Sequence, residues 1–299
     1  MTGLALGLVL FSAFVHASWN YLLKKSGGGP GLITAASSLS LVVYAPIVIG
    51  ALWIQGGYPF RPEHLLLMAG SGLIHTAYFL LLDRAYRSGG DLSIVYPLAR
   101  ATGPLLTIVV AIFALGEHPG TTALAGAVLI GISALVLTGN PFASHRSRGG
   151  PLQRGGHDPR HAVGFALLTG CMIAAYTVWD KTSVAVFLIP PLLYDWGTNA
   201  FRVMVLLPFA RRQAPGAMAR AWSERRGTVV AIALLSPLSY ILVLTAMVFT
   251  PVSLVAPARE VSILFAALMG AHLLKEGDLA RRIVAAVGMV LGIAGLALG

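Results

Sequence analysis

Charged residues and cysteine are both scarce in this chain of 299 residues. Asp, Glu, Lys and Arg make up 11% of the sequence, whereas a soluble domain usually carries about 25% charged residues. The single cysteine, Cys171, excludes an intrachain disulfide framework and offers no metal-ligand spacing, so no metal or other cofactor is expected. With 57% hydrophobic residues, the composition indicates a membrane protein.

The net charge of +10 comes largely from basic residues in short loops between apolar segments. This distribution is typical of membrane orientation, and nucleic acid is not an expected partner. Because Met1-Thr2-Gly3 supplies no basic n-region, the first apolar segment is expected to be a retained span and not a cleaved signal peptide.

Apolar stretches of roughly 20 residues, each bounded by Gly, Pro or charge, predict transmembrane helices along nearly the whole chain. The predicted spans number ten and cover residues 3–23, 31–54, 64–86, 91–115, 120–140, 162–186, 191–210, 228–249, 252–274 and 279–298. The polar stretch 141–161 is rich in Arg, His, Gly and Pro and has the composition of a flexible linker. The expected organisation is a five-helix repeat over residues 1–140, the linker, and a second five-helix repeat over residues 162–299.

Matched residues relate the two predicted repeats. Arg100 lies 17 residues before Glu117, and Arg259 lies 17 residues before Glu276. Because each repeat has an odd number of spans, the second must enter the bilayer upside down. The sequence thus predicts an all-α integral membrane protein with two inverted repeats around a central cavity, the architecture of alternating-access carriers. The alternative is chance similarity among apolar helices.

Basic residues are distributed unevenly among the predicted loops. Loops after even-numbered spans carry only Arg61. By the positive-inside rule, the loops after odd-numbered spans should face the cytoplasm, and both termini should lie outside an inner (plasma) membrane. The basic residues of these odd-numbered loops are Lys24, Lys25, Arg84, Arg87, Arg146, Arg148, Arg154, Arg160, Arg211, Arg212, Arg220, Arg225, Arg226, Lys275, Arg281 and Arg282.

Two arginines are the strongest candidates for substrate binding. An ionised side chain at the bilayer centre costs roughly 2.5–3.5 kcal/mol, so it persists where it is paired or lines a water-filled cavity. Arg100 and Arg259 each shortly follow a proline that tends to kink the helix. Together they would clamp a carboxylate, phosphate or phosphonate. The alternative is an internal ion pair, such as Arg259 with Asp180 or Arg100 with Glu260.

Other polar and aromatic side chains are also expected inside the predicted spans. One group is expected to act in coupling or gating, and His16 would accept a coupled proton because its reference pKa lies near neutrality. For each residue the alternative is interhelical hydrogen bonding or packing. The coupling or gating group is His16, Asp180, Lys181, Asp195 and Arg202. The remaining substrate-binding candidates are Trp19, Asn20, His75, Tyr78, Tyr96, Tyr176, Trp179, Tyr240 and Glu260.

Two further features are expected to be structural. Glu117 and Glu276 lie at span ends, where capping or a loop salt bridge is the expected role. The spacings Gly3-x-x-x-Gly7 and Gly288-x-x-x-Gly292 permit close approach of helices, within the chain or in a homodimer.

Particular motifs resemble the drug/metabolite transporter superfamily, of the EamA type with ten helices and two repeats. They are His16-Ala17-Ser18-Trp19-Asn20, the segment 97–100, and the Leu-x-Glu endings at Glu117 and Glu276. The His-Ala-Ser-Trp-Asn opening resembles a sub-group associated with phosphonate utilisation. The resemblance covers essentially the whole chain and implies a helical basket with alternating access. Members export amino acids and other metabolites or exchange phosphorylated sugars and nucleotide sugars, and many are described with cytoplasmic termini, unlike the orientation predicted here.

A secondary active transporter of a small polar metabolite is the expected function. The predicted mid-span cations (Arg100, Lys181, Arg202, Arg259) outnumber the acids (Asp180, Asp195, Glu260), which favours an anionic or zwitterionic substrate such as an amino acid or organophosphonate. No Gly-x-x-x-x-Gly-Lys-Ser/Thr loop is present, so a gradient must supply the energy, with the proton one candidate coupling ion.

Three other functions remain open from the sequence. The chain lacks His-Glu-x-x-His and Gly-x-Ser-x-Gly, so an enzyme acting on lipid-linked substrates is not expected. A non-transporting receptor or assembly protein would bind a ligand without moving it. An exporter of cationic or aromatic drugs would use the acids and tryptophans. The sequence leaves the substrate, the direction of transport and the choice between monomer and homodimer undecided.

Overall fold

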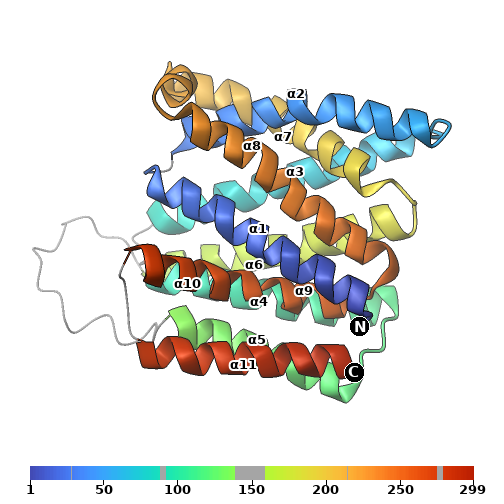
Figure 1. Ribbon diagram of the computed structural model, residues 1–299, viewed down its shortest axis with the longest axis vertical. Helices are drawn as coiled ribbons and strands as arrows, with labels where there is room; N and C mark the ends of the chain where they lie inside the picture. Colours follow the sequence, from blue (N-terminus) through green and yellow to red (C-terminus); the bar gives the residue numbers. More distant parts are fainter. Residues whose placement is uncertain (28, 88–91, 139–158, 214, 275–278) are drawn as a thin grey trace, which may run out of the picture. The chain divides into compact units, whose positions relative to one another are not determined.

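The computed structural model describes residues 1–27, 29–87, 92–138, 159–213, 215–274 and 279–299 (Figure 1). It is all-helical, with 89% helix and no strand among the described residues. The helices are α1 (Gly3–Lys25), α2 (Pro30–Ile54), α3 (Pro62–Arg87), α4 (Leu92–Leu115), α5 (Thr121–Thr138), α6 (Pro159–Ala185), α7 (Pro191–Gln213), α8 (Ala217–Phe249), α9 (Val252–Arg259), α10 (Val261–Leu274) and α11 (Leu279–Leu298).

Apolar runs locate the helices, and proline marks several of their ends. Among the described residues, helix occupies most of each predicted range, and the ninth, residues 252–274, contains both α9 and α10. The first N–H groups of a helix have no intrahelical acceptor, so proline, which lacks an N–H, is favoured at the first helical position. Helices α3, α6 and α7 begin at Pro62, Pro159 and Pro191. Within α9, Pro257 lacks the N–H that would bond the Ser253 carbonyl. The Glu260 amide bonds the Pro257 carbonyl at 3.0 Å, three residues back and not four, and α9 ends there. The ninth range is therefore interrupted at Glu260.

One helix is longer than the sequence predicted. Residues 217–227 were expected between spans, but α8 already begins at Ala217 and includes them. Alanine, methionine and arginine in this segment are good helix formers, which explains the extension. The helix bends at Arg225, whose φ of −139° and ψ of 31° are not helical.

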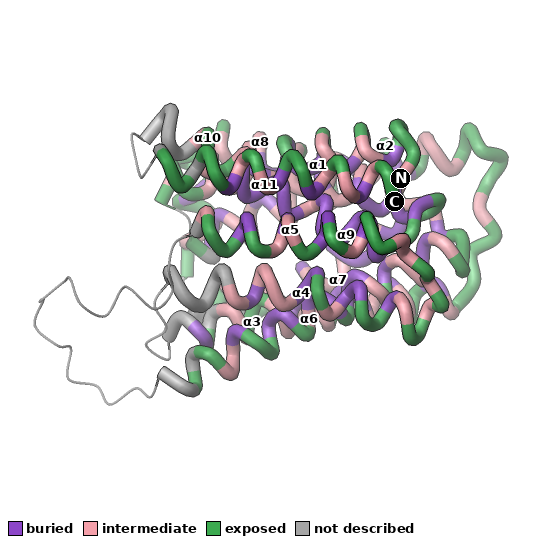
Figure 2. The backbone as a smooth tube through the Cα atoms, turned by 90° about the horizontal axis from the view of Figure 1, so that it is seen from below, coloured by how far each residue is buried: buried purple, intermediate pink, exposed green. Residues whose placement is uncertain are grey.

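The helices have the length and surface of membrane spans. Seven helical stretches among the described residues are long and apolar enough to cross a membrane, and α8 is the most hydrophobic of them. Exposed positions recur along α5 and α11 (Figure 2). Large apolar side chains are exposed on other helices too, including Phe113 of α4 at 85% exposure and Trp53 of α2 at 82%. Since a soluble monomer rarely exposes contiguous apolar patches, these surfaces indicate a multi-pass membrane protein.

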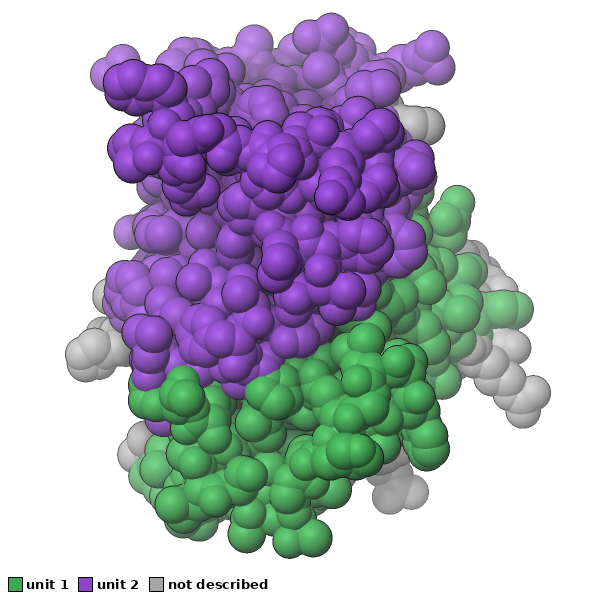
Figure 3. Space-filling view, turned by 90° about the vertical axis from the view of Figure 1, so that its right-hand side faces the viewer, with its two compact units in different colours: residues 1–3, 77–178, 251–299 green, residues 4–76, 179–250 purple. Residues whose placement is uncertain are grey.

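The chain divides into two compact units (Figure 3). Unit 1 contains residues 1–3, 77–178 and 251–299, and unit 2 contains residues 4–76 and 179–250. Each unit takes segments from both predicted repeats. The division of the sequence into repeats over 1–140 and 162–299 stays a prediction, and most of the predicted linker, 141–161, lies outside the described residues.

Unit 1 contains a glycine-mediated helix pair. Helices α5 and α11 pack side by side (Figures 1 and 2). A Cβ added to Gly126 would lie 2.5 Å from the Gly292 carbonyl oxygen, and one added to Gly292 would lie 2.7 Å from the Gly126 carbonyl oxygen. Close approach at the predicted Gly288-x-x-x-Gly292 motif thus occurs within the chain. At Gly3 and Gly7, by contrast, an added Cβ would meet nothing within 4 Å.

Unit 2 packs α2 against both α7 and α8. Leu32 and Ala36 of α2 form a buried apolar cluster with Val229 and Ile232 of α8, and Trp19 of α1 packs on this cluster. At Gly31 an added Cβ would lie 2.6 Å from the Ala217 Cβ, so a side chain is excluded where α2 meets the start of α8. This core fixes the helices that carry the polar residues described below.

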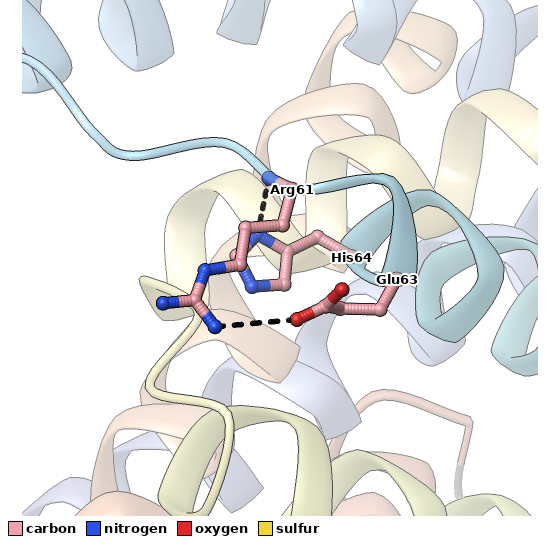
Figure 4. A network of polar contacts seen from close by, with 3 residues as sticks. All are labelled: Arg61, Glu63 and His64. Carbon is pink, nitrogen blue, oxygen red and sulfur yellow. Dashed lines mark hydrogen bonds and ion pairs between the residues drawn. The ribbon is translucent and has the colours of Figure 1, made fainter.

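A small polar network fixes the start of α3 (Figure 4). The Arg61 amide donates to Nδ1 of His64 at 3.2 Å, and Nη1 of Arg61 lies 3.4 Å from Oε1 of Glu63. His64 is buried between the rings of Tyr58 and Phe60. Partial burial raises the pKa of Tyr58, and nearby Arg61 opposes that change. The one basic residue of the even-numbered loops is thus partnered by an acid.

Candidate functional site

A buried carboxylate connects four helices of unit 2. Asp180 of α6 is 0% exposed. Its Oδ1 accepts hydrogen bonds from Ser71 Oγ of α3 at 2.6 Å and from the Tyr194 hydroxyl of α7 at 2.7 Å, and its Oδ2 accepts one from the Tyr240 hydroxyl of α8. Three O–H donors satisfy an ionised carboxylate, which accepts only. The Asp180 carboxyl is therefore hydrogen-bonded at both oxygens within an apolar interior.

His75 extends this network along α3. Its Nδ1 lies 2.9 Å from the Ser71 carbonyl oxygen and 3.3 Å from Ser71 Oγ. A carbonyl oxygen only accepts, so these partners assign the hydrogen to Nδ1. The ring of His75 also meets that of Tyr240 edge to face, with centroids 5.7 Å apart. The structure thus brings together three residues predicted separately, His75, Asp180 and Tyr240.

Two members of the network, Ser71 and Tyr194, were not predicted. Ser71 lies four residues before His75 and shares its helical face, which is the one local signal for it. Tyr194 directly precedes Asp195, but no sequence feature distinguishes it from a packing tyrosine.

A polar face of α7, which includes the predicted residues Asp195 and Arg202, lies against α2. Arg202 donates through Nη2 to Asn199 Oδ1 at 2.6 Å. The Asn199 amide in turn donates to the Ser37 carbonyl oxygen at 3.0 Å and to Ser40 Oγ at 2.9 Å. Asp195 interacts electrostatically with Arg202 and with Asp180. This face therefore continues the charged region around Asp180 towards α2.

Lys181 has a structural position. Its ammonium donates to the carbonyl oxygens of Met247 at 2.6 Å and Thr250 at 3.0 Å, where α8 ends before Pro251. The last carbonyls of a helix lack intrahelical partners, and a cation there also complements the helix dipole. Lys181 thus C-caps α8, and its gating role stays a prediction.

The predicted α1 candidates lie on one face of that helix. His16 meets Trp19 edge to face with ring centroids 5.1 Å apart, and Asn20 Nδ2 donates to the His16 carbonyl oxygen at 2.8 Å. The buried indole N–H of Trp19 has no hydrogen-bond partner within the described part of the chain. The hydroxyls of Ser38 and Thr198, also in unit 2, are unsatisfied in the same way. Such groups are rare in folded proteins and mark places where water or a ligand is expected.

A buried ion pair lies where the ninth predicted span is interrupted, in unit 1. Arg100 Nε of α4 is 3.1 Å from Oε2 of Glu260, and Arg100 Nη2 donates to Ser262 Oγ at 3.1 Å. The two charged side chains are only 17% and 9% exposed. This contact corresponds to the ion-pair alternative for Arg100, and half-buried Arg259 precedes Glu260 at the end of α9.

A small cavity adjoins this ion pair. Arg100 and Glu260 are its charged lining residues, and the other lining residues are apolar or glycine. The free space is about that of one water molecule, and its exposed wall is almost entirely apolar. The cavity is lined by Arg100, Ala101, Pro104, Leu105, Ile108, Ala127, Ile130, Gly131, Ala134, Pro257 and Glu260.

Glu117 caps α9. Gly116, at the end of α4, has a φ of 66°, a left-handed conformation that favours glycine, and it turns the chain so that Glu117 reaches α9. The Glu117 carboxylate accepts from the Val252 amide at 2.8 Å and the Ser253 amide at 2.9 Å. The N-cap residue Pro251 has no side-chain acceptor, so Glu117 supplies the missing cap. The capping role expected for Glu117 is confirmed, whereas Glu276 lies outside the described residues.

Replacing Glu117 with alanine is expected to lower the free energy of unfolding by about 1–2 kcal/mol, because two amides at the start of α9 lose their acceptor. Unfolding by SDS titration of the detergent-purified protein measures this change. Glu224→Ala removes an exposed carboxylate and serves as control, with an expected change within about 0.5 kcal/mol. Equal effects of the two substitutions would contradict the capping role.

The other predicted site residues lie in packed positions. In unit 1, Tyr78 and Tyr176 meet edge to face with ring centroids 6.1 Å apart. In unit 2, Trp179 donates through its indole N–H to the Leu67 carbonyl oxygen at 2.8 Å and lies against Gly70. The side chain of Tyr96 lies outside those that the structure describes. Among the described residues no group of three His, Cys, Asp or Glu side chains is placed to hold a metal ion.

Comparison with known proteins shows the fold and gives no family. No protein-family model matches the chain, and no curated protein matches it. A solved structure described as "Crystal structure of protein" matches it with a TM-score of 0.73 and 15% sequence identity, covering 100% of this chain and 98% of the other. The helical arrangement is therefore one that an experimentally determined chain also adopts over its full length.

Proposed function

We propose that this chain is a secondary active transporter of a small polar metabolite. The observation that carries the proposal is the Arg100–Glu260 ion pair, buried beside a cavity at the interruption of an apolar span. Ionisable residues inside membrane spans are costly and typically mark substrate or ion pathways. Interrupted spans are likewise typical of transporter binding sites.

The same ion pair favours a zwitterionic substrate. Its nitrogen and oxygen lie 3.1 Å apart, so a small zwitterion would exchange partners with both groups at once. A substrate carboxylate or phosphonate would bind the guanidinium of Arg100, and a substrate ammonium would bind the carboxylate of Glu260. Amino acids and aminophosphonates have this chemistry. The cavity beside the pair has room for about one water molecule, so binding of such a substrate would require the surrounding helices to move apart.

Alternating access would come from the proposed inverted repeats of an EamA-type, ten-helix drug/metabolite transporter in the inner membrane. Helices α5 and α11 are the last spans of the two predicted repeats, and their glycines contact one another reciprocally. Unit 1 joins the fourth and fifth predicted spans to the ninth and tenth, and unit 2 joins the second to the seventh. Equivalent spans thus pack together, which supports duplication of a five-helix ancestor.

Thermal unfolding against a ligand panel tests the proposal. A ligand that binds only the folded state stabilises it by about 2.7 kcal/mol at 100 times its Kd. We expect alanine or 2-aminoethylphosphonate to raise the unfolding temperature of the wild type and of Glu63→Gln, whose carboxylate is exposed. Glu260→Gln should lose the shift because the ammonium site is gone. A shift confined to cationic or aromatic compounds would contradict the proposed substrate class and favour a drug exporter.

A further inference from the structure

The proposed substrate site does not use the buried network of unit 2. Asp180 is fully buried and accepts hydrogen bonds from donors on α3, α7 and α8. We propose that Asp180 is a proton-binding site, and that its charge state controls how tightly α3, α7 and α8 are held to α6.

The hydrogen-bond directions make this network specific for the ionised acid. Ser71, Tyr194 and Tyr240 each donate a hydroxyl hydrogen to Asp180. The Nδ1–H of His75 is assigned to the Ser71 carbonyl at 2.9 Å, so the Ser71 hydroxyl hydrogen is directed at Asp180 Oδ1 at 2.6 Å. A neutral carboxylic acid has an O–H of its own that must find an acceptor. Binding of one proton therefore forces at least one of the three hydroxyls to turn away.

The protonation step is balanced and reversible. A proton from water adds to one carboxylate oxygen of Asp180, so the side chain changes from charge −1 to neutral, and the reverse step returns the proton to water. The charged form holds three charge-assisted hydrogen bonds, which are roughly twice as strong as neutral ones. Protonation thus weakens the connection between α6 and the three helices that supply the donors.

The other titratable and charged groups around Asp180 come from each helix of the network. Tyr194 and Asp195 of α7 and Tyr240 of α8 interact with it directly. His75 of α3 contacts Tyr240, and Arg202 of α7 interacts with Asp195 and Tyr240. Lys181 follows it on α6, with its ammonium on the last carbonyls of α8. Asp180, Asp195 and Arg202 together carry one net negative charge when both acids are ionised. One proton neutralises these three groups, which favours a single binding event.

The proposed duplication supports one proton per chain. Trp19 and Trp179 are 160 residues apart, and the same offset aligns Asn20 with Asp180. The side-chain amide of Asn20 does not bind a proton at any pH at which the protein is folded. It donates to the His16 carbonyl oxygen of its own helix. The position is thus titratable in the second repeat alone. That the bound proton drives transport rests on the proposed carrier function, whereas proton binding itself does not.

Infrared difference spectroscopy of the purified protein tests proton binding without any substrate. Lowering the pH should produce a protonated-carboxyl C=O band that is absent from Asp180→Asn and retained by Asp195→Asn. Tyr240→Phe keeps the ring but removes one hydrogen-bond donor to Asp180, so the Asp180 carboxyl band should move to higher frequency in this variant. This second variant keeps the test usable if Asp180→Asn does not fold. No such band over the pH range in which the protein stays folded, or a band that survives in Asp180→Asn, would overturn the proposal.

Hydrogen exchange tests the effect on packing. At one fixed pH, Asp180→Asn mimics the neutral acid and should speed amide exchange in peptides from α3, α7 and α8 relative to the wild type, with peptides from α5 and α11 unchanged. Unchanged exchange in α3, α7 and α8 would overturn the control of helix packing. Because neither readout needs transport, a protein that binds the proton but moves no substrate would contradict the carrier function alone.

Discussion

Replacing Arg100 with methionine is expected to lower the free energy of unfolding by about 3–5 kcal/mol, because it leaves the Glu260 carboxylate charged, buried and without its partner. Methionine keeps most of the apolar stem, so lost packing contributes little. SDS titration of the purified variant measures the change.

Two further variants separate the effect of leaving Glu260 without its partner from a general effect of replacing an arginine. Arg61→Met breaks an ion pair whose side chains are 68% and 46% exposed, and it should change stability by about 1 kcal/mol or less. Arg100→Met combined with Glu260→Met removes both charges and should recover most of the loss. If Arg100→Met costs no more than Arg61→Met, the buried ion pair is not a determinant of the fold.

Replacing Gly126 with alanine is expected to destabilise the protein by up to about 3 kcal/mol, whereas the same change at Gly131 should be neutral or stabilising by about 1 kcal/mol. Both glycines lie in α5. The new methyl carbon at Gly126 would lie 2.5 Å from the Gly292 carbonyl oxygen, so α5 and α11 must separate, while at Gly131 it would meet nothing within 4 Å. The two changes in stability are expected to have opposite signs, because alanine is a better helix former than glycine where no neighbouring atom is crowded.

The reciprocal contact gives this prediction a second test. Gly292→Ala, in α11, should destabilise about as much as Gly126→Ala, since its methyl carbon would lie 2.6 Å from Ile130 Cγ1 and 2.7 Å from the Gly126 carbonyl oxygen. Thermal unfolding of the three single variants in one detergent gives the comparison. Equal unfolding temperatures for Gly126→Ala and Gly131→Ala would contradict the close packing of α5 on α11.

Helix positions were predictable because they depend on local composition. Within the described residues each apolar run coincides with helix, and a bond from the Glu260 amide to the Pro257 carbonyl, three residues back, marks the interruption at Glu260. The extension of α8 back to Ala217 was missed, since a polar segment of good helix formers between spans gives no apolar periodicity. The inverted repeat and the number of membrane crossings remain predictions.

Partners of the charged residues were less predictable. The sequence left Arg100 with two possible roles, and the choice depends on where the α9–α10 interruption places Glu260 in space. The donors to Asp180 are 109, 14 and 60 residues away along the chain. Serine and tyrosine are common in apolar helices, so no local pattern identifies Ser71 or Tyr194 as partners. Helix packing determines these contacts.

The most direct test of the carrier function is flux in proteoliposomes. Radiolabelled alanine and 2-aminoethylphosphonate would be placed on one side of vesicles containing the wild type, Glu63→Gln or Glu260→Gln. The proposed function predicts flux of at least one compound through the wild type and Glu63→Gln, and loss of that flux in Glu260→Gln. Flux through the wild type no greater than that into protein-free vesicles would contradict it, and binding without flux would identify a receptor instead.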